Sequence, residues 1–92
     1  MKSAKSINRS IAIGRLIASG RMMAGLDQSE LAALAKCSPS TVSNVERGLD
    51  ARADTIKSLR LALKKLGVAT NHDSSNQYLS IFLTYEEEED DE

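Results

Sequence analysis

Three short polar side chains, Ser40, Thr41 and Asn44, lie within about one helical turn of one another near the middle of the chain. Hydroxyl and amide groups of this kind donate and accept hydrogen bonds. The Asn44 amide can also make two bonds at once to the edge of an adenine base. The sequence places no nucleophile–base pair, carboxylate pair or metal-ligand spacing around them. These residues therefore indicate recognition by hydrogen bonding, and we expect no enzyme activity, no metal and no cofactor.

The segment before these residues predicts a short helix. Asp27 is typical of a helix N-cap, and Glu30 follows three residues later, which is the spacing of a capping box. The apolar side of this helix is formed by Leu31, Leu34 and Ala35. We expect the helix to run from about residue 28 to residue 36.

A second helix start follows almost at once. Ser38 is a typical N-cap, and Pro39 suits the first helical position because its fixed φ angle is helical and its missing N–H is not needed there. Val42 and Val45 are three residues apart, and Gly48 suits the end of the helix. The pattern predicts a helix of about nine residues.

The short joint between these two helices predicts how they pack. Helices connected by about three residues cannot lie antiparallel, so they cross steeply. This is the helix-turn-helix arrangement, in which the second helix protrudes and can enter the major groove of DNA. The spacing therefore indicates a DNA-binding function.

Two further helices flank this pair. The first, of about four turns, ends near Gly25, and its helical periodicity comes from Ile7, Ile11, Ile13, Leu16, Ile17 and Met23. The last is expected to be capped by Asp54 and to end near Gly67, with its apolar face formed by Ile56, Leu59, Leu63 and Leu66. We expect four to five helices over residues 7–66. Their buried residues should include Ile17, Leu31, Val42, Val45, Leu59 and Leu63.

Beyond the helices the apolar period changes from helical to two. Residues 77–85, QYLSIFLTY, alternate as a strand does, with Leu79, Ile81, Leu83 and Tyr85 on one side. The turn-rich residues 71–76 precede this strand, so a hairpin is expected over residues 67–85. A strand this apolar must pair or aggregate. It can pair with a second copy of the chain, as a dimerisation element, or pack on its own helices.

The net charge of −1 conceals two oppositely charged parts. Residues 1–65 hold all twelve Lys and Arg residues and five acids, a formal charge of +7, whereas residues 66–92 hold eight acids and no Lys or Arg. A basic body of this kind suits a partner rich in phosphate. Residues 86–92, EEEEDDE, are expected to be a disordered acidic tail that aids solubility. Alternatively, the tail folds back on the basic body and mimics phosphate.

Length and composition narrow the class of protein. A chain of 92 residues forms one small domain, which a partner subunit would stabilise, so a dimer is expected. The single cysteine, Cys37, cannot form an internal disulfide and suits a small buried apolar residue. No apolar stretch approaches the ~20 residues of a membrane span. Since Arg15 also interrupts the apolar run of residues 11–18, no secretory segment is indicated and a cytoplasmic protein is expected.

Residues 21–48, RMMAGLDQSELAALAKCSPSTVSNVERG, resemble the Cro and phage-repressor type of helix-turn-helix domain, the Xre-like regulators. The positions that match the family pattern are Arg21, Gly25, Leu26, Gln28, Leu31, Ala32, Ser38, Val42, Ser43, Val45, Glu46 and Gly48. Two positions differ. Lys36 stands where the turn usually has glycine, and Pro39 stands where a glutamine often reads a base. The resemblance covers about residues 10–66. It implies a mainly helical repressor-like domain, to which this chain adds a C-terminal β-hairpin or strand and an acidic tail.

The resemblance also implies roles for single residues. The expected base contacts are Ser40, Thr41 and Asn44. The expected phosphate contacts are Gln28, Ser38, Ser43, Arg47 and Arg52. Ser38 is expected to act first as an N-cap. Glu46 is expected to tie the third helix to the rest of the domain rather than to act chemically.

Two functions therefore stay open. The first is a sequence-specific transcriptional regulator, most simply a repressor that binds a palindromic operator in double-stranded DNA as a homodimer. The second is an antitoxin of the same build, which neutralises a partner toxin through its C-terminal strand or tail and regulates its own operon. A co-purifying second protein would distinguish them.

Overall fold

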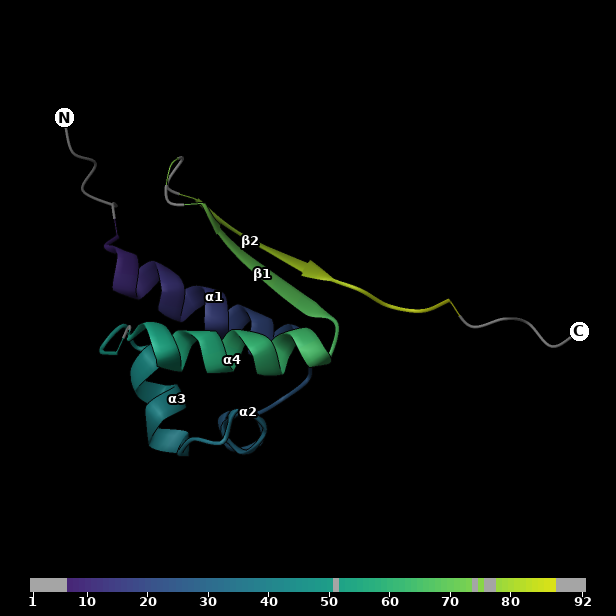
Figure 1. The fold of residues 1–92 in the computed structure, drawn as a ribbon, viewed down its shortest axis with the longest axis horizontal. Helices are drawn as coiled ribbons and strands as arrows, with labels where there is room; N and C mark the ends of the chain where they lie inside the picture. The colour runs from purple at the N-terminus through teal and green to yellow at the C-terminus, as the bar shows by residue number, and fades with distance from the viewer. Residues whose placement is uncertain (1–6, 51, 74, 76–77, 88–92) are drawn as a thin grey trace, which may run out of the picture.

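The computed structural model describes residues 7–50, 52–73, 75 and 78–87. These residues form four helices followed by one β-hairpin (Figure 1). The elements are α1 (Arg9–Met23), α2 (Gln28–Ala35), α3 (Pro39–Glu46), α4 (Ala53–Lys65), β1 (Val68–Asp73) and β2 (Tyr78–Leu83). The mainly helical class with a C-terminal hairpin, predicted from the sequence, is confirmed.

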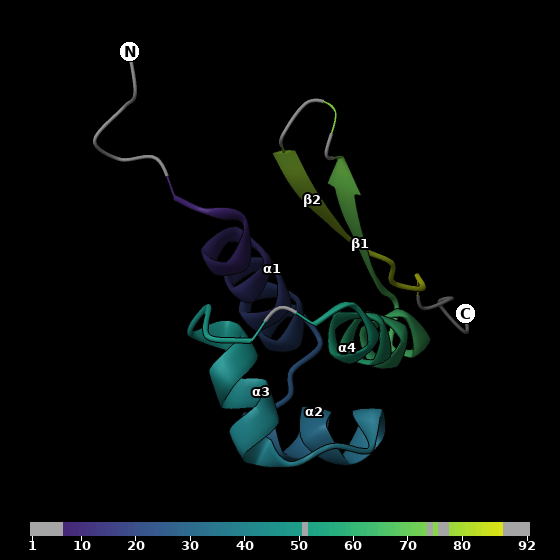
Figure 2. The ribbon, with the colours of Figure 1, turned by 60° about the vertical axis from the view of Figure 1, so that its left-hand side comes forward.

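Helices α1 and α4 separate the other elements into two groups. The hairpin packs against α1 and α4 on one side, and α2 and α3 pack against them on the other (Figures 1 and 2). The α2–α3 pair therefore lies at the end of the molecule opposite the hairpin, where one side of it is open.

The core lies where these elements meet. All six residues predicted to be buried, Ile17, Leu31, Val42, Val45, Leu59 and Leu63, have no solvent-exposed surface. Val68 of β1 is equally buried and belongs to the same cluster, and Ile81 of β2 packs against it. Helices and hairpin thus share one apolar core.

The helix ends follow the local signals in the sequence. The Asp27 carboxylate accepts a hydrogen bond from the Glu30 backbone N–H at 2.8 Å, and the Glu30 carboxylate accepts one from the Asp27 N–H at 2.8 Å. Ser38 Oγ accepts from the Thr41 N–H at 3.1 Å. Gly25, Gly48 and Gly67 all have positive φ angles, as expected of residues that end helices.

Two predicted helix starts were wrong. Ile7 lies before α1 and is 45% exposed, because Asn8 is the N-cap and its side chain accepts from the Ile11 N–H at 2.9 Å. Asp54 does not cap α4, which begins one residue earlier with Arg52 at the N-cap position. The Asp50 carboxylate accepts the Arg52 backbone N–H at 3.0 Å and so orients the chain before the helix. Asp54 instead places a negative charge in the first turn, where the helix dipole favours it.

The hairpin strands are antiparallel, with Val68 opposite Leu83 and Asp73 opposite Tyr78. Past the strand, the Thr84 N–H donates to the Gly67 carbonyl oxygen at 2.8 Å. The side of β2 predicted to carry Leu79, Ile81, Leu83 and Tyr85 is only partly covered, since Leu83 is 47% exposed and Tyr85, beyond the strand end, is 74% exposed. Of the predicted acidic tail, Glu86 and Glu87 are exposed and residues 88–92 lie outside the described residues.

Candidate nucleic-acid interface

The turn between α2 and α3 has three residues, and its first residue takes an unusual conformation. Lys36 has a φ angle of 60° in the left-handed region, which costs an L residue about 1–2 kcal/mol. The Cys37 N–H donates to the Ala32 carbonyl at 2.9 Å and closes the turn. The turn therefore keeps its left-handed position with lysine in place of the glycine usual in such turns.

This short turn makes α2 and α3 cross steeply. Figure 1 shows α2 almost end-on while α3 lies closer to the plane of the picture. The crossing predicted from the short joint is therefore present, and it leaves one side of α3 facing outward.

Helix α3 has one buried and one exposed face. Val42 and Val45 are fully buried against α1 and α2. Ser40, Asn44 and Arg47 are exposed at positions i, i+4 and i+7, so they form one stripe along the helix. Of the three predicted base contacts, the structure thus brings Ser40 and Asn44 together with Arg47 on the outward face.

The third predicted base contact lies to the side of this stripe. Thr41 is half-buried, and its Oγ1 lies 3.0 Å from Ser38 Oγ. Its hydroxyl is thus already paired with the N-cap of α3. Ser43 is also half-buried, on the following turn.

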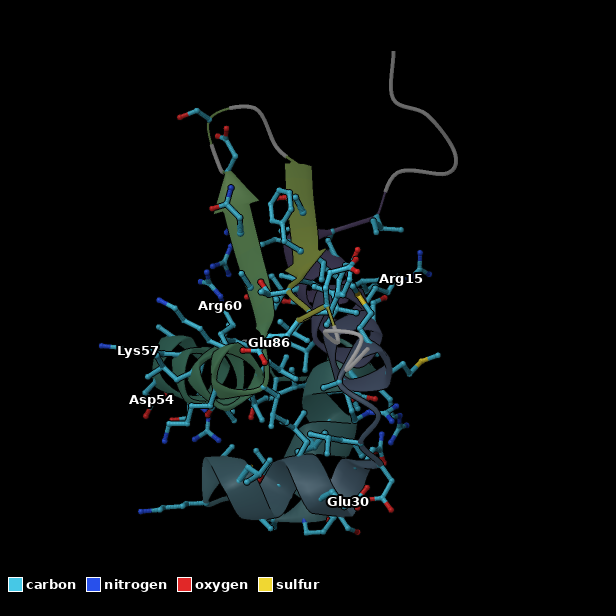
Figure 3. All side chains as sticks on the ribbon, turned by 90° about the vertical axis from the view of Figure 1, so that its right-hand side faces the viewer. Arg15, Glu30, Asp54, Lys57, Arg60 and Glu86 are labelled. Carbon is cyan, nitrogen blue, oxygen red and sulfur yellow. The ribbon has the colours of Figure 1, made fainter. Side chains whose placement is uncertain are left out.

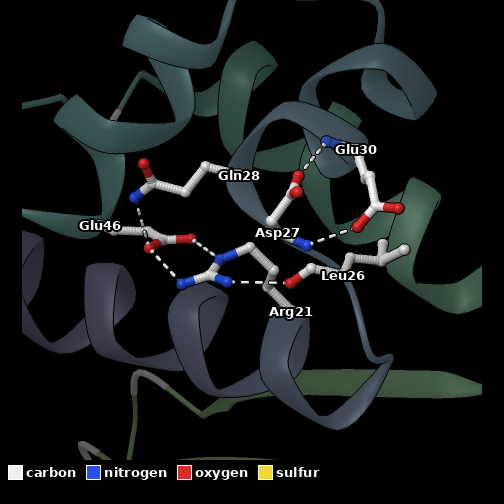
Figure 4. Close-up of polar contacts among 6 residues, drawn as sticks. All are labelled: Arg21, Leu26, Asp27, Gln28, Glu30 and Glu46. Atoms are coloured by element: carbon white, nitrogen blue, oxygen red, sulfur yellow. Dashed lines mark hydrogen bonds and ion pairs between the residues drawn. The ribbon is translucent and has the colours of Figure 1, made fainter.

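A polar network of three side chains joins α1, α2 and α3 (Figure 4). Arg21 Nε donates to Glu46 Oε2 at 2.7 Å, and Arg21 Nη2 donates to Glu46 Oε1 at 3.1 Å, so the ion pair is bidentate. Gln28 Nε2 donates to Glu46 Oε1 at 3.0 Å. The Glu46 side chain is only 7% exposed and that of Arg21 17%. The network therefore fixes the end of α3 relative to the two other helices.

Arg21 also closes the turn after α1. Its Nη1 donates to the Leu26 carbonyl at 2.9 Å. The hydrogen bonds to Glu46 raise the pKa of Arg21 above its ordinary value. Arg21 and Glu46 thus hold α3 at a fixed angle, which is the positioning role expected for Glu46.

Comparison with known families identifies this arrangement. A helix-turn-helix family model matches residues 17–70, more than half of the chain. The chain belongs to the Xre/Cro-like helix-turn-helix family. It is therefore a DNA-binding transcriptional regulator, and the resemblance seen in its sequence is confirmed. A search of curated proteins found no match to the chain. None of the helices within the described residues is long and apolar enough to cross a membrane.

The two arginines among the predicted phosphate contacts of this regulator differ in whether they already form an ion pair. Arg52 donates from Nε and Nη2 to Asp50 at 3.2 and 3.1 Å, which raises the pKa of Arg52 and lowers that of Asp50. Arg47 is exposed and takes no part in the ion pairs found among the described residues. A phosphate would compete with Asp50 for Arg52, whereas Arg47 is available.

Gln28 of the regulator is half-buried at the start of α2. An amide nitrogen carries two hydrogens, so its bond to Glu46 leaves the second hydrogen for another acceptor. Ser38 acts as the N-cap of α3 and is exposed, at the end of α3 opposite Glu46, the residue that Gln28 contacts.

Sequence reasoning missed one residue that positions the interface. A Cβ on Gly14 of α1 would overlap the backbone carbonyl oxygens of Val45 and Glu46, the latter at 2.8 Å. Glycine at this position therefore allows α1 to approach the backbone of α3 closely. The available signal was an isolated glycine inside a helical pattern.

Cys37, within the turn, is half-buried and packs against the core. Burial raises the pKa of its thiol, so the neutral form is favoured. This environment supports its interpretation as a small apolar side chain.

Proposed function

We propose that this regulator is a repressor that binds a palindromic operator as a dimer and places α3 in the major groove. The observation that carries the proposal is the exposed stripe of Ser40, Asn44 and Arg47 on α3. Polar side chains on an outward helix face can read base edges, and the Arg21–Glu46 pair holds that helix at a fixed angle.

Phosphate contacts would surround these base contacts. Arg47 continues the stripe at the C-terminal end of α3, and Ser38 and Gln28 lie at the N-terminal ends of α3 and α2. Helix N-termini favour anions because their N–H groups and dipoles point outward. We assign a phosphate role to Ser43 and Arg52 as well, with Arg52 exchanging Asp50 for the DNA backbone.

The hairpin is the proposed dimerisation element. A two-stranded sheet leaves both edges unpaired, and an apolar edge strand is prone to pair with another chain. Phe82, Leu83 and Tyr85 are 62%, 47% and 74% exposed, so the end of β2 presents apolar surface for a second copy to cover. Because the hairpin lies opposite α2 and α3, such a dimer would leave both recognition helices free (Figure 2).

Replacing Asn44 by alanine should weaken binding to the preferred operator by about 1–3 kcal/mol, because hydrogen bonds to a base edge are lost. Binding to random DNA should change little, since phosphate contacts remain. The measurement is the affinity of wild type and Asn44→Ala for intact, half-site and scrambled duplexes at one salt concentration. Equal losses on all three would show that Asn44 does not read bases.

The same duplexes test the dimer. Two recognition helices on one face of DNA require an inverted repeat with half-site centres one helical turn, about 34–36 Å, apart. Wild type should therefore bind the intact site more tightly than the half-site. Equal affinity for the two would contradict the dimeric operator.

Replacing Arg47 by alanine should weaken binding to all sequences alike. Each neutralised phosphate contributes about −0.9 to the slope of log affinity against log salt, so this variant should reduce the slope by about one. Affinities measured over a range of salt concentrations give the slope. Loss of affinity for only one operator sequence would instead make Arg47 a base-reading residue.

The exposed apolar residues of β2 also support a second candidate, an antitoxin that covers this strand with a partner toxin. Expression of the chain together with its neighbouring genes, followed by purification, tests it. A stable complex with a second protein would favour the antitoxin, whereas a homodimer alone would favour the repressor.

A further inference from the structure

A basic trough lies between α4, β1 and α1, on the side that carries the hairpin. It consists of two grooves with volumes of about 290 and 360 Å³. Lys57 and Arg60 line both, Lys64 lines the first and Arg9 the second. No acidic residue is among the described residues that line them. The trough thus gathers three cations of α4 and one of α1.

Among the residues that the structure describes, no acidic side chain forms an ion pair with a cation of the trough. Arg60 is held in place by Thr70, to which it donates from Nε and Nη2 at 2.7 Å each. Both acceptors are uncharged oxygens, so these bonds bring no counter-charge to the guanidinium. None of the four cations belongs to either ion pair found in the described part of the chain, although Asp54 is one turn from Lys57.

We propose that this trough binds the acidic C-terminal segment of the same chain, residues 86–92. The segment consists of seven consecutive carboxylic acids, and no Lys or Arg follows Lys65. Its charge therefore complements that of the trough.

Strand β2 delivers the segment to the correct end of the trough. The hydrogen bond from Thr84 to the Gly67 carbonyl, at 2.8 Å, places the end of the strand beside the C-terminus of α4. Figure 3 shows Glu86 in front of this end of α4, with Arg60 and Lys57 projecting from the same helix. The acidic run thus starts two residues beyond Thr84, whose backbone is bonded to the residue that follows the end of α4.

The length of the segment is sufficient. Eight residues beyond Thr84 extend up to about 26 Å at ~3.3 Å each. Gly67 and Lys57 are ten residues apart, which corresponds to about 15 Å along a helix. Residues 84–87 continue past the end of α4 (Figure 1), so docking requires the chain beyond Thr84 to leave this course and run back along α4, past Lys64, Arg60 and Lys57.

Docking in the trough would leave α3 uncovered, because α3 lies on the other side of α1 and α4 (Figure 2). The bound carboxylates would compete with phosphates for the four cations. The segment would therefore weaken the general attraction of the body for anions without blocking the stripe on α3.

The test compares the full chain with a chain that ends at Tyr85, by amide NMR spectra and without DNA. At about 0.01 M salt the signals of Lys57, Arg60 and Lys64 should differ between the two chains. At about 1 M salt, where charges are screened beyond about 3 Å, the differences should vanish. The signals of Arg47, on the opposite side, should be the same in both chains. Unchanged α4 signals on deletion at low salt would overturn the proposal.

A charge reversal tests the trough itself in the full chain. Lys57→Glu combined with Lys64→Glu should make the amides of residues 86–92 relax as fast at low salt as they do at high salt. The matched control, Arg15→Glu combined with Lys36→Glu, reverses two exposed charges outside the trough and should leave that relaxation slow. Equal effects of the two double substitutions on the relaxation of residues 86–92 would overturn the proposal.

Mixing chains tests the assignment to the same chain. Unlabelled full chain is added to labelled chain that ends at Tyr85, and the labelled α4 signals are followed. Unchanged signals support docking within one chain. Shifts that reproduce the full-chain spectrum would show that the segment binds a second copy instead, and would overturn the assignment. None of these measurements depends on DNA binding.

Discussion

Replacement of Glu46 by alanine is expected to lower the free energy of unfolding by about 3 kcal/mol, the lower end of the range for breaking a buried ion pair. Arg21 would lose its bidentate partner while its side chain stays 83% covered, and Gln28 would lose its acceptor. A mostly covered guanidinium without a counter-charge is costly because its hydration is only partly restored. Urea unfolding of wild type and variant gives the difference.

A matched control shows how much of this loss comes from the polar network and how much from removing a carboxylate in general. Glu30→Ala removes an exposed acid that accepts one capping hydrogen bond, so a loss of only about 1 kcal/mol is expected. Arg21→Ala and the double variant complete a thermodynamic cycle. The two losses should be less than additive, because removing both partners leaves no unpaired charge. Strict additivity would show that Arg21 and Glu46 do not stabilise one another.

Replacement of Gly14 by alanine should also destabilise the fold, by about 3 kcal/mol, the upper end of the range for overpacking. In a helix interior, replacing glycine by alanine normally stabilises the helix by about 1 kcal/mol, so the expected change in stability has the opposite sign here. The reason is that the new Cβ would collide with the carbonyl oxygens of Val45 and Glu46. Both are backbone atoms, so α1 and α3 would have to move apart.

Gly20 on the same helix supplies the control. A Cβ at Gly20 would meet Leu63 Cδ1 at 2.9 Å and Val68 Cγ1 at 3.4 Å, which are side-chain atoms that can shift. Gly20→Ala should therefore cost less than Gly14→Ala in the same urea experiment. If Gly14→Ala were as stable as wild type, the close approach of α1 to α3 would be wrong.

Much of the helix-turn-helix could be predicted because its signals are local. Asp27 with Glu30, and Ser38 with Thr41, are hydrogen-bonded over three residues, so the partners are already near one another in the chain. Apolar spacing likewise identified the residues of the core, since the buried face of a helix repeats with its turn. The start of α4 was mispredicted because the Asp50 carboxylate, outside the helix, bonds to Arg52 and shifts the boundary.

The helices and the three-residue joint could be predicted from the sequence because capping and turn signals act within a few residues, and the hairpin could be predicted from the period-two alternation of its second strand. Which polar residues face outward depends on how the helices pack: Ser40, Asn44 and Arg47 lie on the open stripe, whereas Thr41 lies beside it. The tertiary structure also decided that Gly14 touches the backbone of α3, and that Arg60 is fixed by Thr70 beside two unpaired lysines. These features depend on how helices cross and on which backbones approach, and residues far apart in a chain carry no local signal of that geometry.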